Sequence, residues 1–461
     1  MIAGESIERL LHTSQRPDRS QVRQIIAIAK ELQGLSLEEV APLLQLEDEA
    51  GWEEVFAAAG EVKERIYGRR VVLFAPLYIT NECINNCQYC GFRRDNREAH
   101  RKTLTVEEIE AETGVLLRQG HKRLLLVFGE HPRWGGIEYV EKAIGAVYGA
   151  RGNGANIRRV NVNLAPLSVE DFRRLKGTGI GTYQIFQETY HRPSYRILHP
   201  CGPKADYDWR ISAFDRAFQG KIDDVGMGVL FGLYDYRFEV LSLLAHIGYL
   251  EQTYGIGPHT ISFPRVKPAP GAPLSVNPPA RVSDFELKKV VATLRLAVPY
   301  TGLILTTREG PNLRDELFRL GVSQISAGSK TSPGSYGDQK PEDWQGTKQF
   351  EIEDRRSLDQ VVYDLCQIGY IPSFCTACYR LGRTGQEFMN LAKPGFIQGY
   401  CTPNALLTFK EYLLDYASSK TREVGEKVLL RHFGEIADGR TRQLTERKLK
   451  EMESGKRDLY F

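Results

Sequence analysis

The chain contains few cysteines for its length, and they are unevenly placed. Eight cysteines among 461 residues are too few for a disulfide scaffold. Two of them, Cys201 and Cys366, stand alone, and we expect both to be ordinary buried or half-buried thiols. The other six form two tight groups, as metal ligands do. The groups are Cys83, Cys87 and Cys90, and Cys375, Cys378 and Cys401.

Long apolar runs and an excess of charge of one sign are also missing. No window approaches the roughly 18 apolar residues that span a bilayer, and the N-terminus has no apolar core of a signal peptide. Sixty-one Lys and Arg against 58 Asp and Glu leave a net charge of +3, without a basic run. These absences predict a soluble, cytoplasmic protein that binds neither membrane nor nucleic acid, and whose partner is a small molecule.

The length and the patterning divide the chain into three parts. Its 461 residues exceed the roughly 250 to 300 at which a single core stops growing. In residues 1–68, apolar side chains recur at three- and four-residue spacing, which predicts a helical extension. Residues 69–335 alternate short apolar runs with helical patterns. Residues 336–461 begin as a polar connector and continue as a mostly helical domain that carries the second cysteine group.

Eight strand-like runs in residues 69–335 predict the central fold. Strands that alternate with helices are typical of a parallel (β/α)8 barrel of the TIM type, with a doubly wound open sheet as the alternative. Functional residues of such a barrel lie at the carboxyl ends of its strands. The first cysteine group meets this condition, because it follows the first strand without an intervening helix. The runs are 71–79, 123–130, 160–167, 183–190, 225–233, 260–266, 303–308 and 324–329.

The first cysteine group places three thiols within eight residues. Soft thiolates select iron-sulfur clusters, zinc or copper(I), and a four-iron cluster held by three cysteines keeps one iron open to another ligand. A structural zinc knuckle is the alternative, but it needs a fourth ligand nearby. His100 is the only further Cys or His within fifteen residues. An iron-sulfur cluster with an open iron is therefore the favoured interpretation.

Polar residues stand at the ends of later strands. Glu130 closes the second strand, and Asn161 and Asn163 alternate along the third, so both asparagines could face the barrel interior. Glu188 closes the fourth strand, and Arg210 follows it with a side chain that can bind a carboxylate through two hydrogen bonds. Each could equally form a surface salt bridge or a solvated turn.

The spacing of the first cysteine group, with Tyr89 before its last cysteine and a barrel after it, resembles the radical S-adenosylmethionine superfamily. The resemblance implies a 4Fe-4S cluster whose open iron binds S-adenosylmethionine, the source of a 5′-deoxyadenosyl radical. The Gly129-Glu130 pair resembles the family motif that holds the methionyl ammonium group. Glu188 and Arg210 match positions that contact the ribose and carboxylate. The expected cofactor contacts are Tyr89, Gly129, Glu130, Asn161, Asn163, Glu188 and Arg210.

The second cysteine group narrows the resemblance. Cys375 and Cys378 enclose two residues, and Cys401 lies twenty-three positions beyond Cys378. A zinc ribbon would need a fourth Cys or His, and His432 is thirty-one residues past Cys401. The two cysteine groups together, over nearly the whole chain, resemble the HydG family of tyrosine lyases that mature FeFe-hydrogenase. Tyrosine lyases of thiazole synthesis share the barrel but lack the second group.

The resemblance to HydG implies a reaction, partners and a second metal site. The Cα–Cβ bond of L-tyrosine is cleaved to p-cresol and dehydroglycine, and dehydroglycine is converted to carbon monoxide and cyanide. These ligands are assembled on a second 4Fe-4S cluster with an additional iron, which His259 binds. A low-potential electron donor and hydrogenase maturation proteins are the implied partners. Because His259 starts the sixth strand, on the amino face, the C-terminal domain should dock beneath the barrel.

The sequence gives little indication of which residues contact the substrate. An amino-acid carboxylate needs a cation or hydroxyl groups, and Arg265, Arg308 and Ser326 lie on late strands. Two other functions remain open. One is a radical S-adenosylmethionine enzyme, such as the thiazole-type lyase, that uses the second cluster as a sulfur donor or electron relay. The other is an iron-sulfur scaffold without catalytic activity.

Overall fold

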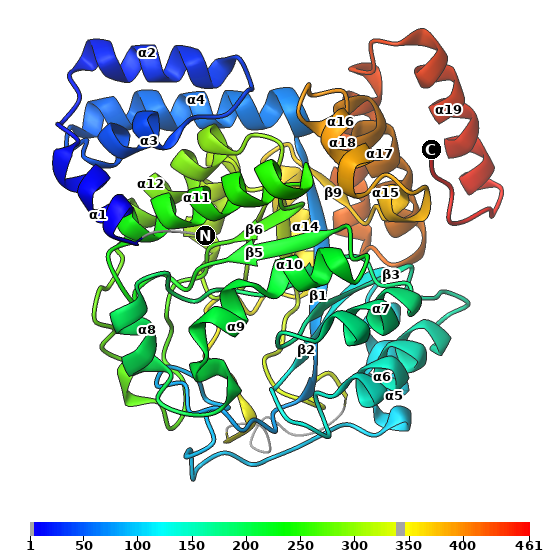
Figure 1. Ribbon diagram of the computed structural model, residues 1–461. Helices are drawn as coiled ribbons and strands as arrows, with labels where there is room; N and C mark the ends of the chain where they lie inside the picture. The colour runs from blue at the N-terminus through cyan, green and yellow to red at the C-terminus, as the bar shows by residue number, and fades with distance from the viewer. Residues whose placement is uncertain (1–3, 338–345) are drawn as a thin grey trace.

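A closed barrel of eight parallel strands forms the centre of the molecule (Figure 1). The computed structural model describes residues 4–337 and 346–461. Each strand pairs with the next in sequence, and β1 pairs with both β2 and β8, so the sheet closes on itself. The predicted (β/α)8 barrel is confirmed. The strands are β1 (Arg70–Thr80), β2 (Arg123–Phe128), β3 (Arg159–Asn163), β4 (Tyr183–Gln184), β5 (Val225–Gly228), β6 (Thr260–Ser262), β7 (Gly302–Leu305) and β8 (Gln324–Ser326).

Helices surround the barrel. Thr105 begins the first of them with a capping box, in which its hydroxyl accepts from Glu108 N–H and Glu108 accepts from Thr105 N–H. The single helix expected over 209–218 is divided at Ser212 into two. The helices are α5 (Val106–Arg118), α6 (Ile137–Gly149), α7 (Val169–Gly177), α8 (Arg192–Leu198), α9 (Tyr207–Ile211), α10 (Ala213–Gln219), α11 (Tyr236–Tyr254), α12 (Asp284–Ala297) and α13 (Pro311–Leu320).

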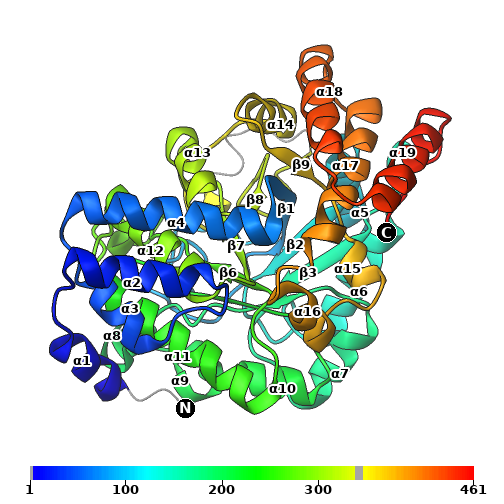
Figure 2. The same ribbon diagram turned by 90° about the horizontal axis from the view of Figure 1, so that it is seen from above.

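The predicted N-terminal extension is a layer of four helices. They are α1 (Gly4–Thr13), α2 (Arg19–Lys30), α3 (Leu37–Leu44) and α4 (Glu49–Tyr67). α4 packs on α12 and α13, while α1 and α3 pack on α11 (Figure 2). Trp52 of α4 is fully buried and donates to the carbonyl of Leu46 at 2.9 Å. The extension therefore covers the outer helices of one side of the barrel.

The C-terminal domain is helical but more divided than expected. The helical pattern of residues 406–461 is divided, because Ser418 and Asp438 each cap a new helix. The helices are α14 (Leu358–Gln367), α15 (Ala377–Arg380), α16 (Gly385–Ala392), α17 (Gln398–Asp415), α18 (Ser419–Gly434) and α19 (Gly439–Glu453). Residues 338–345 of the predicted connector lie outside the described residues.

A ninth strand joins this domain to the barrel. β9 (Ile371–Ser373) runs parallel to the first three residues of β1, pairing Arg70 with Ile371 and Val72 with Ser373. Further along, β1 pairs with β8 from Val72 to Phe74 and with β2 from Ala75 onward. Because a strand has two edges and Val72 pairs with both β8 and β9, β9 lies on the edge that β2 occupies higher up. The domain is thus anchored at the amino end of β1.

None of the helices in the described part of the chain is long and apolar enough to cross a membrane.

Candidate functional site

The loop after β1 holds the first cysteine group at the carboxyl face. Arg101 fixes this loop by donating to four of its backbone carbonyls, those of residues 81, 92, 93 and 94. The loop also packs against the end of β2, where a side chain at Gly129 would place its Cβ 2.2 Å from the carbonyl oxygen of Glu82. Glycine is required at this position, because any larger residue would displace the cysteine loop.

Of the three thiols of this loop, Cys87 is buried and the other two are half-buried. Burial raises the pKa of each, to about 11 for Cys90, and the positive charge of Lys204 opposes the rise. Within residues 4–337 and 346–461, no group of three or more His, Cys, Asp or Glu side chains is placed to hold a metal ion. Three thiolates are the ligand set of a 4Fe-4S cluster that binds each thiolate through a different iron and keeps one iron open.

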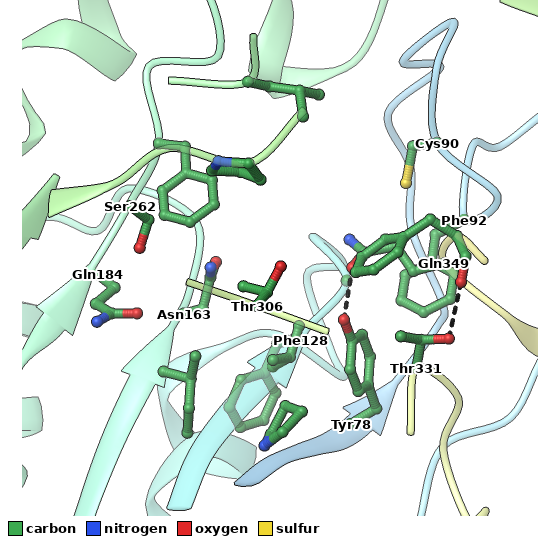
Figure 3. A pocket seen from close by; sticks show the side chains of 18 of the residues that line it. Tyr78, Cys90, Phe92, Phe128, Asn163, Gln184, Ser262, Thr306, Thr331 and Gln349 are labelled. Carbon is green, nitrogen blue, oxygen red and sulfur yellow. Dashed lines mark hydrogen bonds between the residues drawn. The ribbon is translucent and has the colours of Figure 1, made fainter. Parts of the chain in front are cut away.

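A cavity of about 190 Å³ opens beside these thiols, inside the carboxyl end of the barrel. Figure 3 shows Cys90 and Phe92 on one side of it and Asn163, Gln184 and Ser262 on the other. Its wall contains apolar and aromatic side chains from most strands and a few polar groups. This composition is typical of sites that enclose and orient a small molecule.

Charged groups of the cavity are balanced within the chain. Glu188 adopts φ = 69°, a left-handed conformation that is strained for a non-glycine residue. Its Oε1 accepts from Lys204 Nζ at 2.6 Å and Arg210 Nη2 at 3.4 Å. The buried carboxyl of Glu239 accepts from the next two residues, from the hydroxyl of Thr189 and from Tyr190 N–H. α11 thereby holds the turn that presents Glu188 to the cavity.

Glu130 and Tyr89 also line this cavity. Glu130 accepts from Asn85, a residue of the cysteine loop itself, with 2.5 Å between Oε2 and Nδ2. The Tyr89 hydroxyl lies 2.8 Å from Nε2 of His199, whose Nδ1 contacts the carbonyl of Tyr195. Since the carbonyl requires a proton on Nδ1, the Tyr89 hydroxyl donates to Nε2. Burial lowers the pKa of His199, which keeps the imidazole neutral.

The structure separates the two asparagines of β3. Asn163 lines the cavity, whereas Asn161 does not. The Oδ1 atom of Asn161 accepts instead from the backbone of Thr182 at 3.0 Å, one layer deeper in the barrel. Asn161 is thus outside the lining of this cavity, and its contact with the cofactor stays a prediction.

The three substrate candidates also separate. Arg308 and Ser326 line the cavity. Arg265 does not, and it forms ion pairs with Glu309 and Asp284 at the rim of a separate open groove. The expectation of a substrate contact is corrected for Arg265, because its guanidinium is already engaged by carboxylates of the chain.

Residues that sequence reasoning missed complete the cavity. Lys204 donates a hydrogen bond to Glu188, and Asn85 donates one to Glu130. Neither donor belongs to a recognised sequence motif. Gln349 and Phe350 come from the polar stretch that was expected to be a connector. The Tyr78 hydroxyl donates to Gln349 at 2.8 Å, as Figure 3 shows, and the Arg308 guanidinium stacks 3.3 Å from the centre of the Phe350 ring.

A glycine in the cysteine loop makes this closure possible. Gly91 N–H donates to the carbonyl of Gln349 at 3.0 Å. A Cβ at Gly91 would lie 2.2 Å from the carbonyl oxygen of Lys348, which is far too close. The glycine that follows Cys90 was therefore the one feature of the sequence that could have indicated the contact between the cysteine loop and residues 348–349.

The second cysteine group lies at the opposite end of the barrel. Cys375 follows β9 directly, Cys378 lies in α15 and Cys401 in α17. Cys401 is buried and the other two are half-buried. Burial raises the pKa of Cys375 and Cys378, the latter to about 12. As on the carboxyl face, three cysteines are the ligand set of a cluster that keeps one iron open.

His259 lies against this domain on the amino face. Its ring stacks on Phe388 of α16 at 4.0 Å and on Tyr379, the residue after Cys378, at 5.4 Å between ring centres. Its Nδ1 lies 2.6 Å from Oδ2 of Asp224, which is 2% exposed. Burial alone would raise the pKa of Asp224, but His259 lowers it overall. A carboxylate on Nδ1 leaves Nε2 available to a metal.

Comparisons with known proteins cover both ends of the barrel. Residues 77–244 match the radical SAM superfamily, and residues 262–371 match the biotin and thiamin synthesis associated domain. The chain is similar to 2-iminoacetate synthase of Escherichia coli K12, with 32% identity over 336 residues, 73% of this chain and 85% of that protein. Both family matches end before Cys375, so the second cysteine group lies outside them.

Two solved structures extend over that group as well. The chain is 48% identical to a structure described as HydG, a maturase of the FeFe-hydrogenase, with a TM-score of 0.95 and 99% of both chains covered. It is 42% identical to the HydG maturase of Carboxydothermus hydrogenoformans, with a TM-score of 0.84 and 97% of both chains covered.

Proposed function

The chain belongs to the HydG family within the radical SAM superfamily, and on this basis we propose that it cleaves L-tyrosine to p-cresol and dehydroglycine. Dehydroglycine is then converted to carbon monoxide and cyanide, which become ligands of an iron precursor for FeFe-hydrogenase. Dehydroglycine and 2-iminoacetate are the same compound, so the name of the Escherichia coli relative supports the first step. The observation that carries the proposal is the placement of three-cysteine groups at both ends of one barrel.

On the carboxyl face, Cys83, Cys87 and Cys90 would hold a 4Fe-4S cluster. With S-adenosylmethionine bound, the cluster supplies the adenosyl radical that abstracts hydrogen from tyrosine, using an electron from a low-potential donor. Glu130, already oriented by Asn85, accepts hydrogen bonds from the cofactor's ammonium group.

Glu188 and Arg210 are placed for the other polar groups of the cofactor. Their mutual contact at 3.4 Å holds both side chains toward the cavity before the cofactor binds. Asn163 offers a further amide from β3. The aromatic and aliphatic wall excludes water, which would otherwise quench a radical intermediate.

Arg308 and Ser326 hold the carboxylate and ammonium end of tyrosine. The Arg308 side chain is half-buried, and among the described residues its guanidinium donates one hydrogen bond, to the carbonyl of Arg265 at 3.3 Å. Its remaining donors face the cavity and can bind a carboxylate. Phe350 fixes the plane of the guanidinium by stacking on it.

On the amino face, Cys375, Cys378 and Cys401 would hold the second 4Fe-4S cluster, and Nε2 of His259 the additional iron. This iron accepts the carbon monoxide and cyanide ligands before transfer to other hydrogenase maturation proteins. Asp224 sets the direction of the His259 ring from the barrel side, and Phe388 sets its plane from the domain side.

The test is anaerobic reconstitution followed by iron and sulfide counting and a tyrosine assay. We expect about nine irons and about eight sulfides per chain, together with p-cresol, carbon monoxide and cyanide. p-Cresol without cyanide would instead indicate a thiazole-type lyase. Absence of p-cresol would reject both tyrosine reactions and leave a scaffold or another radical reaction.

The role of His259 has a separate test. His259→Ala should form p-cresol at the parent rate but contain about one iron fewer, since one ligand of a single additional iron is lost. His432→Ala is the matched control, because His432 is also buried in this region but is engaged by Glu435 and the carbonyl of Gly369. An unchanged iron count in His259→Ala would reject the assignment.

A further inference from the structure

Arg70, the first residue of β1, is a buried cation without a counter-charge. The residue is 8% exposed, and its Nε is fully buried without a hydrogen-bond partner. Among the residues described, its guanidinium forms no ion pair and no hydrogen bond. Its one specific contact is the face of the Tyr67 ring, 4.8 Å from the guanidinium carbon. Burying an unpaired charge is costly, so a negatively charged partner is expected.

Two contacts place the start of β1 between the segment that carries Cys375 and Cys378 and the helix that carries Cys401. In the β1–β9 ladder, Arg70 pairs with Ile371, and the strand ends two residues before Cys375. On the other side, a Cβ at Gly68 would lie 3.6 Å from Oγ1 of Thr402, the residue after Cys401. The β1–β9 ladder and α17 thus bring both segments of the second cysteine group to the start of β1, where Arg70 lies.

The electrostatic surroundings agree with this placement. Burial alone would lower the pKa of Arg70, but the attraction of Cys401, Tyr67, Cys375 and Cys378 raises it overall. In its thiolate form the second cysteine group, together with Tyr67, is thus the leading source of negative charge at Arg70.

Other buried arginines of this chain are satisfied internally. Arg295 is fully buried and also lies over the Tyr67 ring, at 5.6 Å, but it donates to three backbone carbonyls, those of Gly321, Pro299 and Thr301. Arg314 pairs with Asp354. These two arginines have hydrogen-bond or ion-pair partners that Arg70 lacks, and Arg383 is a second cation that acts on Cys375 and Cys378.

We propose that Arg70 is the counter-cation of the second iron-sulfur cluster, and that it donates hydrogen bonds to the sulfur atoms of that cluster. The proposal rests on the assignment of a cluster to Cys375, Cys378 and Cys401. Three thiolates give a 4Fe-4S core a net negative charge. A cation and hydrogen bonds to sulfur favour the more negative, reduced state, so Arg70 raises the reduction potential of this cluster.

The first experiment isolates the second cluster in the full-length chain. Cys83, Cys87 and Cys90 are replaced by alanine, and this parent is compared with Arg70→Gln and Arg70→Lys. Each protein is reconstituted anaerobically, its iron and sulfide are counted, and the midpoint potential is measured by EPR-monitored titration. We expect a more negative potential in Arg70→Gln and an intermediate one in Arg70→Lys, because lysine keeps the charge but not the planar set of donors.

Arg295→Gln is the matched control, because it removes a second buried guanidinium from the same Tyr67 ring without facing the thiols. Its potential should equal that of the parent. A fully loaded Arg70→Gln with the parent potential would overturn the proposal, and it would also be the result if Arg70 bound only a diffusible anion. If the parent itself loads no cluster, the cluster assignment fails first, so the two failures are distinguishable.

A second measurement separates this role from simple packing. Without the cluster, Arg70→Gln should unfold at the same temperature as the parent or a higher one, because an unpaired buried charge has been removed. With the cluster, it should unfold at a lower temperature than the loaded parent. Arg295→Gln should lower both temperatures. Equal decreases in the empty and loaded forms of Arg70→Gln would show a purely structural residue and contradict the proposal.

Discussion

The two ends of the barrel carry the same three-cysteine ligand set in different surroundings. On the carboxyl face Glu188 is paired with Lys204 and Arg210, and a cavity adjoins the thiols. On the amino face Arg70 is left unpaired against the thiols. The first arrangement is complete without a fixed ligand and can exchange small molecules. The second is incomplete without a resident anionic group.

The largest expected effect comes from removing either cysteine group. Replacing Cys83, Cys87 and Cys90 by alanine should abolish p-cresol, carbon monoxide and cyanide together, because the radical step precedes the others. Replacing the three distal cysteines should preserve p-cresol and abolish carbon monoxide and cyanide. Product analysis by chromatography and gas binding distinguishes the two. Retention of cyanide in the distal variant would show that the ends of the barrel are not divided in this way.

A second comparison uses two arginines of neighbouring late strands. Arg308→Gln should lower p-cresol formation by about 10- to 100-fold, which corresponds to the loss of a charge-assisted hydrogen bond to the substrate carboxylate. Arg265→Gln should chiefly lower the melting temperature, since it leaves Glu309 without one of its cation partners. Steady-state kinetics and thermal unfolding of both variants test this. Equal kinetic losses would contradict the placement of the substrate at Arg308.

A third prediction concerns pH and the carboxyl face alone. Burial raises the pKa of Glu239 to about 8 from its ordinary value of 4.5. Between these values the folded protein keeps a proton that the unfolded chain has lost, so stability falls as pH rises, by up to about 1.4 kcal/mol per pH unit. Glu239→Gln should remove this slope. Denaturant unfolding between pH 5 and pH 8 measures it, and parallel slopes in both proteins would contradict the assignment.

The smallest effects are expected from the two cysteines outside both groups. Cys366→Ala should cost about 1 kcal/mol, because it removes a buried sulfur from the core. Cys201→Ser should change stability less, because that residue is half-exposed. Neither should alter the iron count or any product. A lower iron count in either variant would mean that a fourth thiol contributes to one of the two sites.

Much of the fold could be predicted because strands and barrel helices have local signatures. The eight apolar runs and the capping box at Thr105 are examples. The breaks at Ser418 and Asp438 were missed, because the helical pattern of residues 406–461 continues across both caps. Their side chains resemble any surface Ser or Asp in the sequence.

The parts of the site that were missed depend on distant segments. Gln349 meets Tyr78 across 271 positions of sequence, and Lys204 meets Glu188 through a turn that has no motif. Asn161 and Arg265 have suitable chemistry, and their sequence neighbours do not reveal which partners they bind. Arg70 looks like any polar residue at the start of a strand. Only the docking of β9 and α17 shows that it is buried.

β1 acts as a fixed spacer between the two ends of the molecule. Its 11 residues, at about 3.3 Å each, make it roughly 36 Å long, with Arg70 at one end and the cysteine loop at the other. Three neighbouring strands hold its register. Inserting or deleting one residue would reverse the side of the sheet on which one end presents its side chains. The spacing of the two sites is therefore encoded in the length of a single strand, which can change only if both sites are rebuilt.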